Sequence, residues 1–290
     1  MLDPCFTAPS PEVILRARHG CTVGTHMSEP TVILPGAGEI IGDSPDRRVE
    51  ILSDHDALAA TWSRFGPRRE GADPHVHRRH SDLFYVLAGE LTVMLGPEHR
   101  DVLVPAGTLA MIPPLVVHGF RNGGDAEVRY LNLHAPGEGF ADYLRALRDG
   151  RTGAYDQEPP PPDGGRPATD ADVGGDGFRA DGVKLLADVE AIAVTEVWSG
   201  PGEGSAPPHR HRRHVESFYV IEGELALTAG GRELRARAGS WLQVPPGVRH
   251  SVSFPGAAPA RLLDVHTPNR GFGAFLRAFE GASWAAFDEH

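Results

Sequence analysis

The sequence predicts an all-β protein made of two tandem barrels, each followed by a short helix. Short apolar runs dominate the chain, and glycine and proline separate them about every eight to twelve residues, a spacing typical of a sandwich or barrel. The same pattern occurs twice along the 290 residues, which indicates a duplicated unit. Helical spacing of apolar residues is found only at the end of each copy.

The repeat predicts the domain boundaries. Residues 49–54 (VEILSD) match residues 183–188 (VKLLAD), and residues 133–146 match residues 265–278. Between the copies, residues 149–181 are rich in proline, glycine and aspartate, so we expect a semi-stiff, partly disordered acidic linker. The division is a flexible extension at 1–30, a first barrel at 31–148, the linker at 149–181 and a second barrel at 182–290.

The elements follow in order within each copy. Residues 54–65 contain alanines that suit a helix, but their counterparts at 192–198 suit a strand, and one fold must serve both, so we predict a strand. Apolar runs at 83–87, 91–95, 102–104, 109–112 and 128–133 predict the next strands. The closing helices are predicted from apolar residues at helical spacing: Phe140, Tyr143, Leu144 and Leu147, and Phe272, Phe275, Leu276 and Phe279.

Composition narrows the classes of partner. A formal net charge of −11 argues against a nucleic acid or an anionic membrane. No apolar run is long enough to span a bilayer, and the first 26 residues lack the apolar core of a signal peptide. We therefore expect a cytoplasmic protein whose partner is a small-molecule substrate. Self-association through exposed sheet edges stays open.

The N-terminal extension lies outside the repeat. It contains both cysteines, Cys5 and Cys21, which therefore cannot cross-link either barrel, and nothing indicates an oxidising compartment. Met27 is a candidate translation start. An intact mass of the natively expressed protein that includes residues before Met27 would reject this hypothesis.

Each copy carries three histidines and one carboxylate in the same order. These residues are His75, His77, Asp82 and His118 in the first copy, and His209, His211, Glu216 and His250 in the second. Residues two apart on a strand share a face, so each histidine pair projects one way. A bend at 78–81 places Asp82 on the interior face, and the turn after Pro113 lets His118 return from another strand.

Such a set suits a divalent transition metal, with up to one ion per barrel. Three imidazoles and a carboxylate suit iron, manganese, nickel, cobalt, copper or zinc, and the donor types do not select among them. One or two coordination positions would remain for water, dioxygen or a chelating substrate.

These motifs resemble those of the cupin superfamily, and the chain resembles a bicupin. The superfamily has a histidine pair, a carboxylate and a glycine, followed by a glycine, a proline and a last histidine. Here the further matching residues are Gly89, Gly107 and Pro113, and Gly223, Gly239 and Pro245. The first copy departs twice, because Asp82 replaces the usual glutamate and Leu115 stands where the second copy has Gly247. The resemblance implies double-stranded β-helix (jelly-roll) barrels.

The resemblance also implies a set of activities. The leading hypothesis is a non-haem metal dioxygenase similar to quercetinase-type enzymes, acting on a flavonol-like or other hydroxy-carbonyl substrate. The ligand carboxylates Glu216 and Asp82 would act as the catalytic bases. One alternative is a metal-dependent isomerase or decarboxylase of a keto acid or sugar, which would consume no oxygen. A third is a non-catalytic bicupin that binds a small ligand and forms no product.

Two further histidine pairs recur in the repeat. For His80 and His214, in the His-Arg-Arg-His segments, we favour exposed polar turns over contacts to the ligands or the substrate. His134 and His266 end a strand before the closing helix. We expect them to pack or form hydrogen bonds and do not count them as metal ligands.

Overall fold

The computed structural model describes residues 29–175, 177–180, 182–201 and 205–278. Cys5, Cys21, Met27 and Phe279 lie outside the described residues. Among the described residues, no helix is long and apolar enough to cross a membrane.

The first barrel is built from a large and a small antiparallel sheet. The large sheet has the order β11 (Asp172–Val173), β8 (Leu109–Ile112), β5 (Ser81–Ala88), β10 (Val128–Ala135), β4 (Leu58–Phe65), β3 (Arg47–His55) and β2 (Glu39–Ser44). The small sheet has the order β7 (Arg100–Pro105), β6 (Glu90–Leu95) and β9 (His118–Arg121). The strand predicted at 54–65 is confirmed as the end of β3 and all of β4.

The second barrel repeats this plan. Its large sheet has the order β1 (Thr31–Ile33), β19 (Trp241–Val244), β16 (Val215–Glu222), β21 (Ala260–Thr267), β14 (Ile192–Ser199), β13 (Val183–Val189) and β12 (Arg179–Ala180). Its small sheet has the order β15 (Ser205–His209), β20 (His250–Ser253), β17 (Glu224–Ala229) and β18 (Arg232–Arg237). The prediction of two tandem jelly-roll barrels is confirmed.

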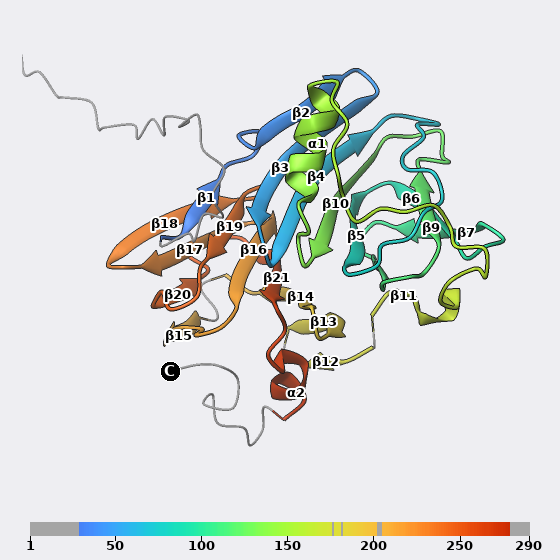
Figure 1. Cartoon of the computed structure of the whole chain (residues 1–290). Helices are drawn as coiled ribbons and strands as arrows, with labels where there is room; N and C mark the ends of the chain where they lie inside the picture. The colour runs from blue at the N-terminus through green and yellow to red at the C-terminus, as the bar shows by residue number, and fades with distance from the viewer. Residues whose placement is uncertain (1–28, 176, 181, 202–204, 279–290) are drawn as a thin grey trace, which may run out of the picture.

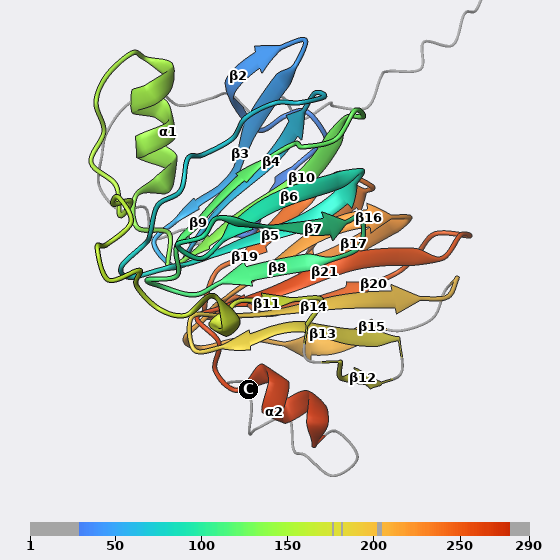
Figure 2. The same ribbon diagram turned by 90° about the vertical axis from the view of Figure 1, so that its right-hand side faces the viewer.

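Each barrel is followed by the predicted helix, α1 (Phe140–Arg148) or α2 (Phe272–Arg277). The helix α1 lies against β2 and β3, and the two helices occupy opposite ends of the molecule (Figures 1 and 2). Arg145 anchors α1, because its guanidinium pairs with Glu39 of β2 at 2.7 Å and Asp54 of β3 at 2.6 Å. A single 3-10 turn at Ala168–Asp170 is the other helical segment among the described residues.

Alternate residues of the central strands serve two different cores. On β5, Phe84 and Val86 point into the first barrel, whereas Leu83 and Tyr85 belong to a cluster shared by both barrels. That shared cluster also contains Tyr219 and other buried residues of the second barrel. Both faces of β5 are therefore buried, which explains why its sequence reads as a continuous apolar run.

The barrels also exchange short strands. Thr31–Ile33 was predicted to begin the first barrel, yet it pairs with β19 of the second. Asp172–Val173 precedes the second barrel and pairs with β8 of the first. Because β8 and β19 are equivalent strands of the repeat, each barrel has the edge of its large sheet covered by a segment that leads into the other barrel.

Candidate metal centres and the pocket of the first barrel

The first predicted cluster comes together inside the first barrel. The backbone groups of His75 and His118 bond to each other in both directions, at 2.8 and 2.9 Å, which brings the segment before β5 beside β9. The Nε2 atoms of His75 and His77 are 3.2 Å apart, and Nε2 of His118 is 3.3 Å from Oδ2 of Asp82. All four side chains are buried, and one donor atom of each lies within 4.8 Å of the others.

The other ring nitrogen of each histidine has a fixed role. Nδ1 of His75 donates to the carbonyl oxygen of Asp73 at 2.6 Å. Nδ1 of His77 donates to that of Asp156 at 2.5 Å, and Nδ1 of His118 donates to that of Val116 at 2.9 Å. A carbonyl only accepts, so the proton is on Nδ1 and the Nε2 lone pair faces the cluster. Burial, with the nearby His118 and His77, lowers the pKa of His75 to about 3. Neutral imidazoles with converging lone pairs fit a divalent transition metal.

The second predicted cluster has the same plan. Oε2 of Glu216 lies 2.5 Å from Nε2 of His250, 3.0 Å from that of His211 and 3.8 Å from that of His209. Nδ1 donates to the carbonyl of Pro207 in His209, at 2.7 Å, and to that of Val248 in His250, at 2.9 Å. Burial would raise the pKa of Glu216, but His211 and His250 outweigh it and hold the pKa well below its ordinary value.

The two clusters differ in the residue behind the carboxylate. In the first barrel Asn132 donates from Nδ2 to Oδ1 of Asp82 and accepts from Nε2 of His134 at 2.9 Å. The equivalent residue of the second barrel is Asp264, which accepts from Nε2 of His266 at 3.2 Å. Burial and the adjacent Glu216 raise the pKa of Asp264 well above its ordinary value, which favours its neutral form.

His80 and His214 are not exposed, so the turn interpretation is wrong. Their exposed fractions are 0% and 1%. Nδ1 of His80 donates to Oδ2 of Asp156 at 3.0 Å, and the Tyr155 hydroxyl lies 2.8 Å from Nε2 of His80. The same hydroxyl is 2.7 Å from Nδ1 of His134, which confirms the hydrogen-bonding role expected of that histidine.

Sequence reasoning therefore missed Tyr155 and Asp156, which come from the predicted linker. Asp156 also accepts from the backbone N–H groups of Arg78 and Arg79, at 3.1 and 2.8 Å. At the offset of 132 that relates residues 133–146 to residues 265–278, Ala154, Tyr155 and Asp156 match Ala286, Phe287 and Asp288. This continuation of the repeat was the available signal, and it was missed because the repeat was followed only as far as the predicted linker.

A cavity of about 260 Å³ opens beside the first cluster. Three of the cluster residues, His75, His77 and Asp82, lie in its wall. The rest of the wall comes from the interior of β3, β4, β9 and β10, from α1 and from the segment after α1, including Phe65, Phe120, Tyr130, Phe140, Tyr143 and Tyr155. The first cluster thus faces an aromatic pocket that α1 closes on one side.

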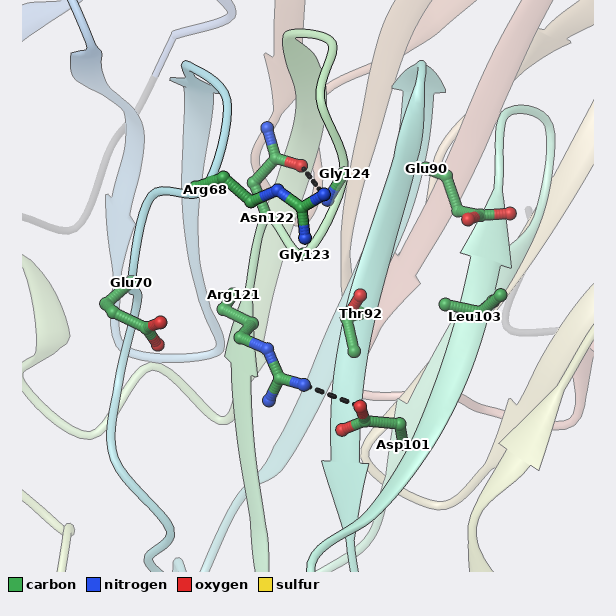
Figure 3. Close-up of a pocket in the computed structure, with 10 residues that line it drawn as sticks. All are labelled: Arg68, Glu70, Glu90, Thr92, Asp101, Leu103, Arg121, Asn122, Gly123 and Gly124. Carbon is green, nitrogen blue, oxygen red and sulfur yellow. Dashed lines mark hydrogen bonds and ion pairs between the residues drawn. The ribbon is translucent and has the colours of Figure 1, made fainter.

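A second hollow is unrelated to the histidines. Figure 3 shows it on the outer face of the small sheet, where Arg121 pairs with Asp101 at 2.5 Å and Glu70, Glu90 and Thr92 lie around them. Its lining contains no histidine or cysteine, and its charges are already partly paired. It offers no reactive constellation.

The chain contains two cupin domains and is a bicupin. The cupin domain family matches residues 61–134 and residues 198–266. These two matches cover most of both barrels and include all eight cluster residues. The family resemblance noted from the two histidine motifs is thereby confirmed.

One curated relative matches part of the chain. Quercetin 2,3-dioxygenase of Bacillus subtilis (strain 168) is 33% identical over 64 residues. That stretch is 22% of this chain and 18% of the relative, so the chain matches less than a fifth of the relative's length.

Solved structures share the architecture over most of the chain. Oxalate decarboxylase from Lactobacillus farciminis is 14% identical, with 85% of this chain and 88% of that one covered at a TM-score of 0.55. A Bacillus subtilis oxalate decarboxylase variant is 17% identical, with 92% and 86% covered at 0.56. Protein Ylba from E. coli is 11% identical, with 84% and 93% covered at 0.59. At these identities the likeness shows the fold.

The departure at Leu115 is accommodated by the backbone. Leu115 has φ of 69°, and its N–H bonds to the carbonyl of His77 at 2.7 Å. Gly247, with φ of 82°, bonds in the same way to His211 at 2.6 Å. Both turns close on the second histidine of the pair, so the first barrel keeps the turn with a residue that fits a left-handed conformation less well.

Proposed function

We propose that the protein is a metal-dependent bicupin dioxygenase acting on a small, aromatic-like hydroxy-carbonyl substrate. The observation that carries the proposal is the opening of the first cluster into a pocket of about 260 Å³ with aromatic walls. The partial match to quercetin 2,3-dioxygenase supports oxygen chemistry over an isomerase or decarboxylase reaction.

The ligands in this proposal are the eight predicted residues, four in each barrel. His75, His77, Asp82 and His118 would hold one ion, and His209, His211, Glu216 and His250 the other. A bound divalent transition metal would supply Lewis acidity toward the hydroxy-carbonyl group and redox chemistry toward dioxygen.

The protein's own groups would control the proton and the solvent. Asp82 and Glu216 are the bases that take the substrate hydroxyl proton, each in its own barrel. Asn132 fixes the orientation of the Asp82 carboxylate through its Nδ2–H. The aromatic wall, with Phe140 and Tyr143 of α1, excludes water from the reacting group.

The test is oxygen uptake by metal-loaded protein supplied with quercetin and with smaller 3-hydroxy-4-pyrones. We expect uptake from the wild type, and retained metal with lost turnover from Asp82→Asn and Glu216→Gln. Turnover that persists in both variants with metal bound would exclude these residues as bases. Product formation without oxygen consumption would favour the isomerase or decarboxylase alternative, and tight binding without product would favour a ligand-binding bicupin.

A further inference from the structure

The pocket of the first barrel contains an arginine without a partner. Arg47 lies on β3 and lines the pocket with His75, His77 and Asp82. Its Nε atom is inaccessible to solvent and has no hydrogen-bond partner among the described residues. Its guanidinium carbon is 5.6 Å from the centre of the Phe65 ring, a contact that leaves the buried Nε–H unsatisfied.

The neighbouring arginine, Arg48, differs from Arg47 because its guanidinium forms ion pairs. Arg48 points away from the pocket and pairs with Glu50 at 2.7 Å and Asp43 at 2.8 Å. Arg47 forms no ion pair with any described carboxylate. Because an arginine with a buried, unsatisfied donor is costly, an anion that completes its hydrogen bonds would be bound favourably.

The walls between Arg47 and the cluster are polar only in the first barrel. Tyr130 and Ser63 face each other across β10 and β4, and the same cross-strand pair in the second barrel is Leu262 and Val197. Leu262 belongs to the packed core of that barrel, with Val197 against it. The repeat position of Arg47 is Asp181, which lies outside the described residues.

The charges of Arg47 and Asp82, which both line the pocket, act on the hydroxyl of Tyr130. Burial and the charge of Asp82 raise the pKa of the Tyr130 hydroxyl. A hydrogen bond with Ser63 and the charge of Arg47 lower this pKa, but burial is the largest effect. In the large sheet, β10 and β4 separate β5, which carries Asp82, from β3, which carries Arg47. The two charges are therefore separated by two strands of one sheet, and both act on the Tyr130 hydroxyl.

We infer that the substrate of the first barrel carries a carboxylate in addition to its hydroxy-carbonyl group, and that Arg47 binds this carboxylate. The inference rests on the proposed function, since it assumes that the hydroxy-carbonyl end lies at the histidine–aspartate cluster. A planar guanidinium offers two parallel donors that match a carboxylate. Arg47 is thus a specificity-determining residue of the first barrel.

Two pyrones that differ by one carboxylate provide the probe. Pyromeconic acid is 3-hydroxy-4-pyrone, and comenic acid has the same hydroxy-carbonyl group with a carboxylate on the opposite side of the ring. Binding of each to the metal-loaded protein is measured by titration calorimetry, for the wild type, Arg47→Gln and Arg47→Lys. Arg100→Gln, an exposed arginine on β7, is the charge-matched control, and His75→Ala tests the chelating end.

We expect the wild type and Arg100→Gln to bind comenic acid more tightly than pyromeconic acid. Arg47→Gln should weaken the binding of comenic acid by about 10- to 100-fold, because a charge-assisted pair of hydrogen bonds is lost. The binding of pyromeconic acid should be nearly unchanged. Arg47→Lys retains the charge and should retain part of the preference. Recovery in Arg47→Lys also separates recognition from a folding defect in Arg47→Gln.

The outcomes separate the two proposals. Equal binding of both probes, dependent on His75 and insensitive to Arg47, would overturn the carboxylate inference and leave the chelating site standing. Failure of both probes to bind the metal-loaded wild type would overturn the hydroxy-carbonyl site and the inference that rests on it.

Discussion

Asn132 and Asp264 occupy the same position in the two barrels, but one side chain is an amide and the other a carboxyl group with a raised pKa. Asn132 donates a hydrogen bond to Asp82, and Asp264 stands beside Glu216 with its Oδ1 unpartnered among the described residues. Burial and the charge of Glu216 raise the pKa of Asp264, whereas the pKa of Glu216 is held low by His211 and His250. The two clusters therefore share a ligand plan and differ in the group that supports the carboxylate.

This difference predicts an asymmetric response to exchanging the two residues. Asn132→Asp should lower the free energy of unfolding at pH 7 by about 2–4 kcal/mol, because Asp82 loses a donor and gains a second buried carboxylate. Asp264→Asn should change it by less than about 1 kcal/mol, since the raised pKa of Asp264 favours its neutral form and an amide is neutral and of similar shape. Urea denaturation of chelator-treated protein measures both. Equal effects would contradict a raised pKa of Asp264.

Metal content should follow the two clusters independently. Protein purified without chelator or affinity metal should contain about two ions per chain by elemental analysis, one for each set of four ligands. His75→Ala and His209→Ala should each retain about one ion, and the double variant almost none. His99→Asn, an exposed histidine in the β6–β7 turn, serves as the control. Wild-type protein that takes up no metal on titration would overturn the ligand assignment.

The segment after α1 should be part of the first centre. Asp156→Ala removes the acceptor of two backbone N–H groups and of the His80 ring, so we expect a loss of about 2–3 kcal/mol in the free energy of unfolding. Metal retention by the first cluster should fall by about tenfold, because the Asp156 carboxylate holds in place the segment whose backbone carbonyl orients His77. Asp170 is an exposed acid of the same segment, so Asp170→Ala should change the free energy of unfolding and the metal retention only slightly. Equal effects from the two variants would argue against this role.

Stability of the metal-free protein should depend on pH in a defined direction. Burial lowers the pKa of His75 and His266 to about 3 and of His80 to about 4, from 6.5. The unfolded chain therefore binds protons below about pH 6.5 that the folded chain does not, so stability is full above 6.5 and falls as the pH drops toward 4. Denaturant midpoints measured with chelator between pH 7.5 and about 4.5 test this. A flat profile over that window would contradict neutral buried histidines.

Several features of the protein could be predicted from residue order alone. The duplication, the strand spacing and the recurrent histidine–carboxylate pattern predict two jelly-roll barrels and place both sets of candidate ligands. Periodicity works here because β5 and its counterpart β16 must bury both faces, so that almost any polar residue within them, such as Asp82 or Glu216, stands out.

Other features depend on contacts between segments that sequence spacing does not encode. The burial of His80 is set by Asp156 and Tyr155, which lie more than seventy residues away in sequence. The exchange of Thr31–Ile33 and Asp172–Val173 between barrels depends on which sheet edge each short strand can reach.

The sequence by itself determined the repeat, the fold class and the ligand types, because these follow from local periodicity and from the chemistry of single side chains. Only the tertiary structure decided that Arg47 and Asp82 share one pocket and that burial beside Glu216 raises the pKa of Asp264. Pocket membership and protonation depend on distances and burial between strands that are not adjacent in sequence, and these exist only once the sheets have closed.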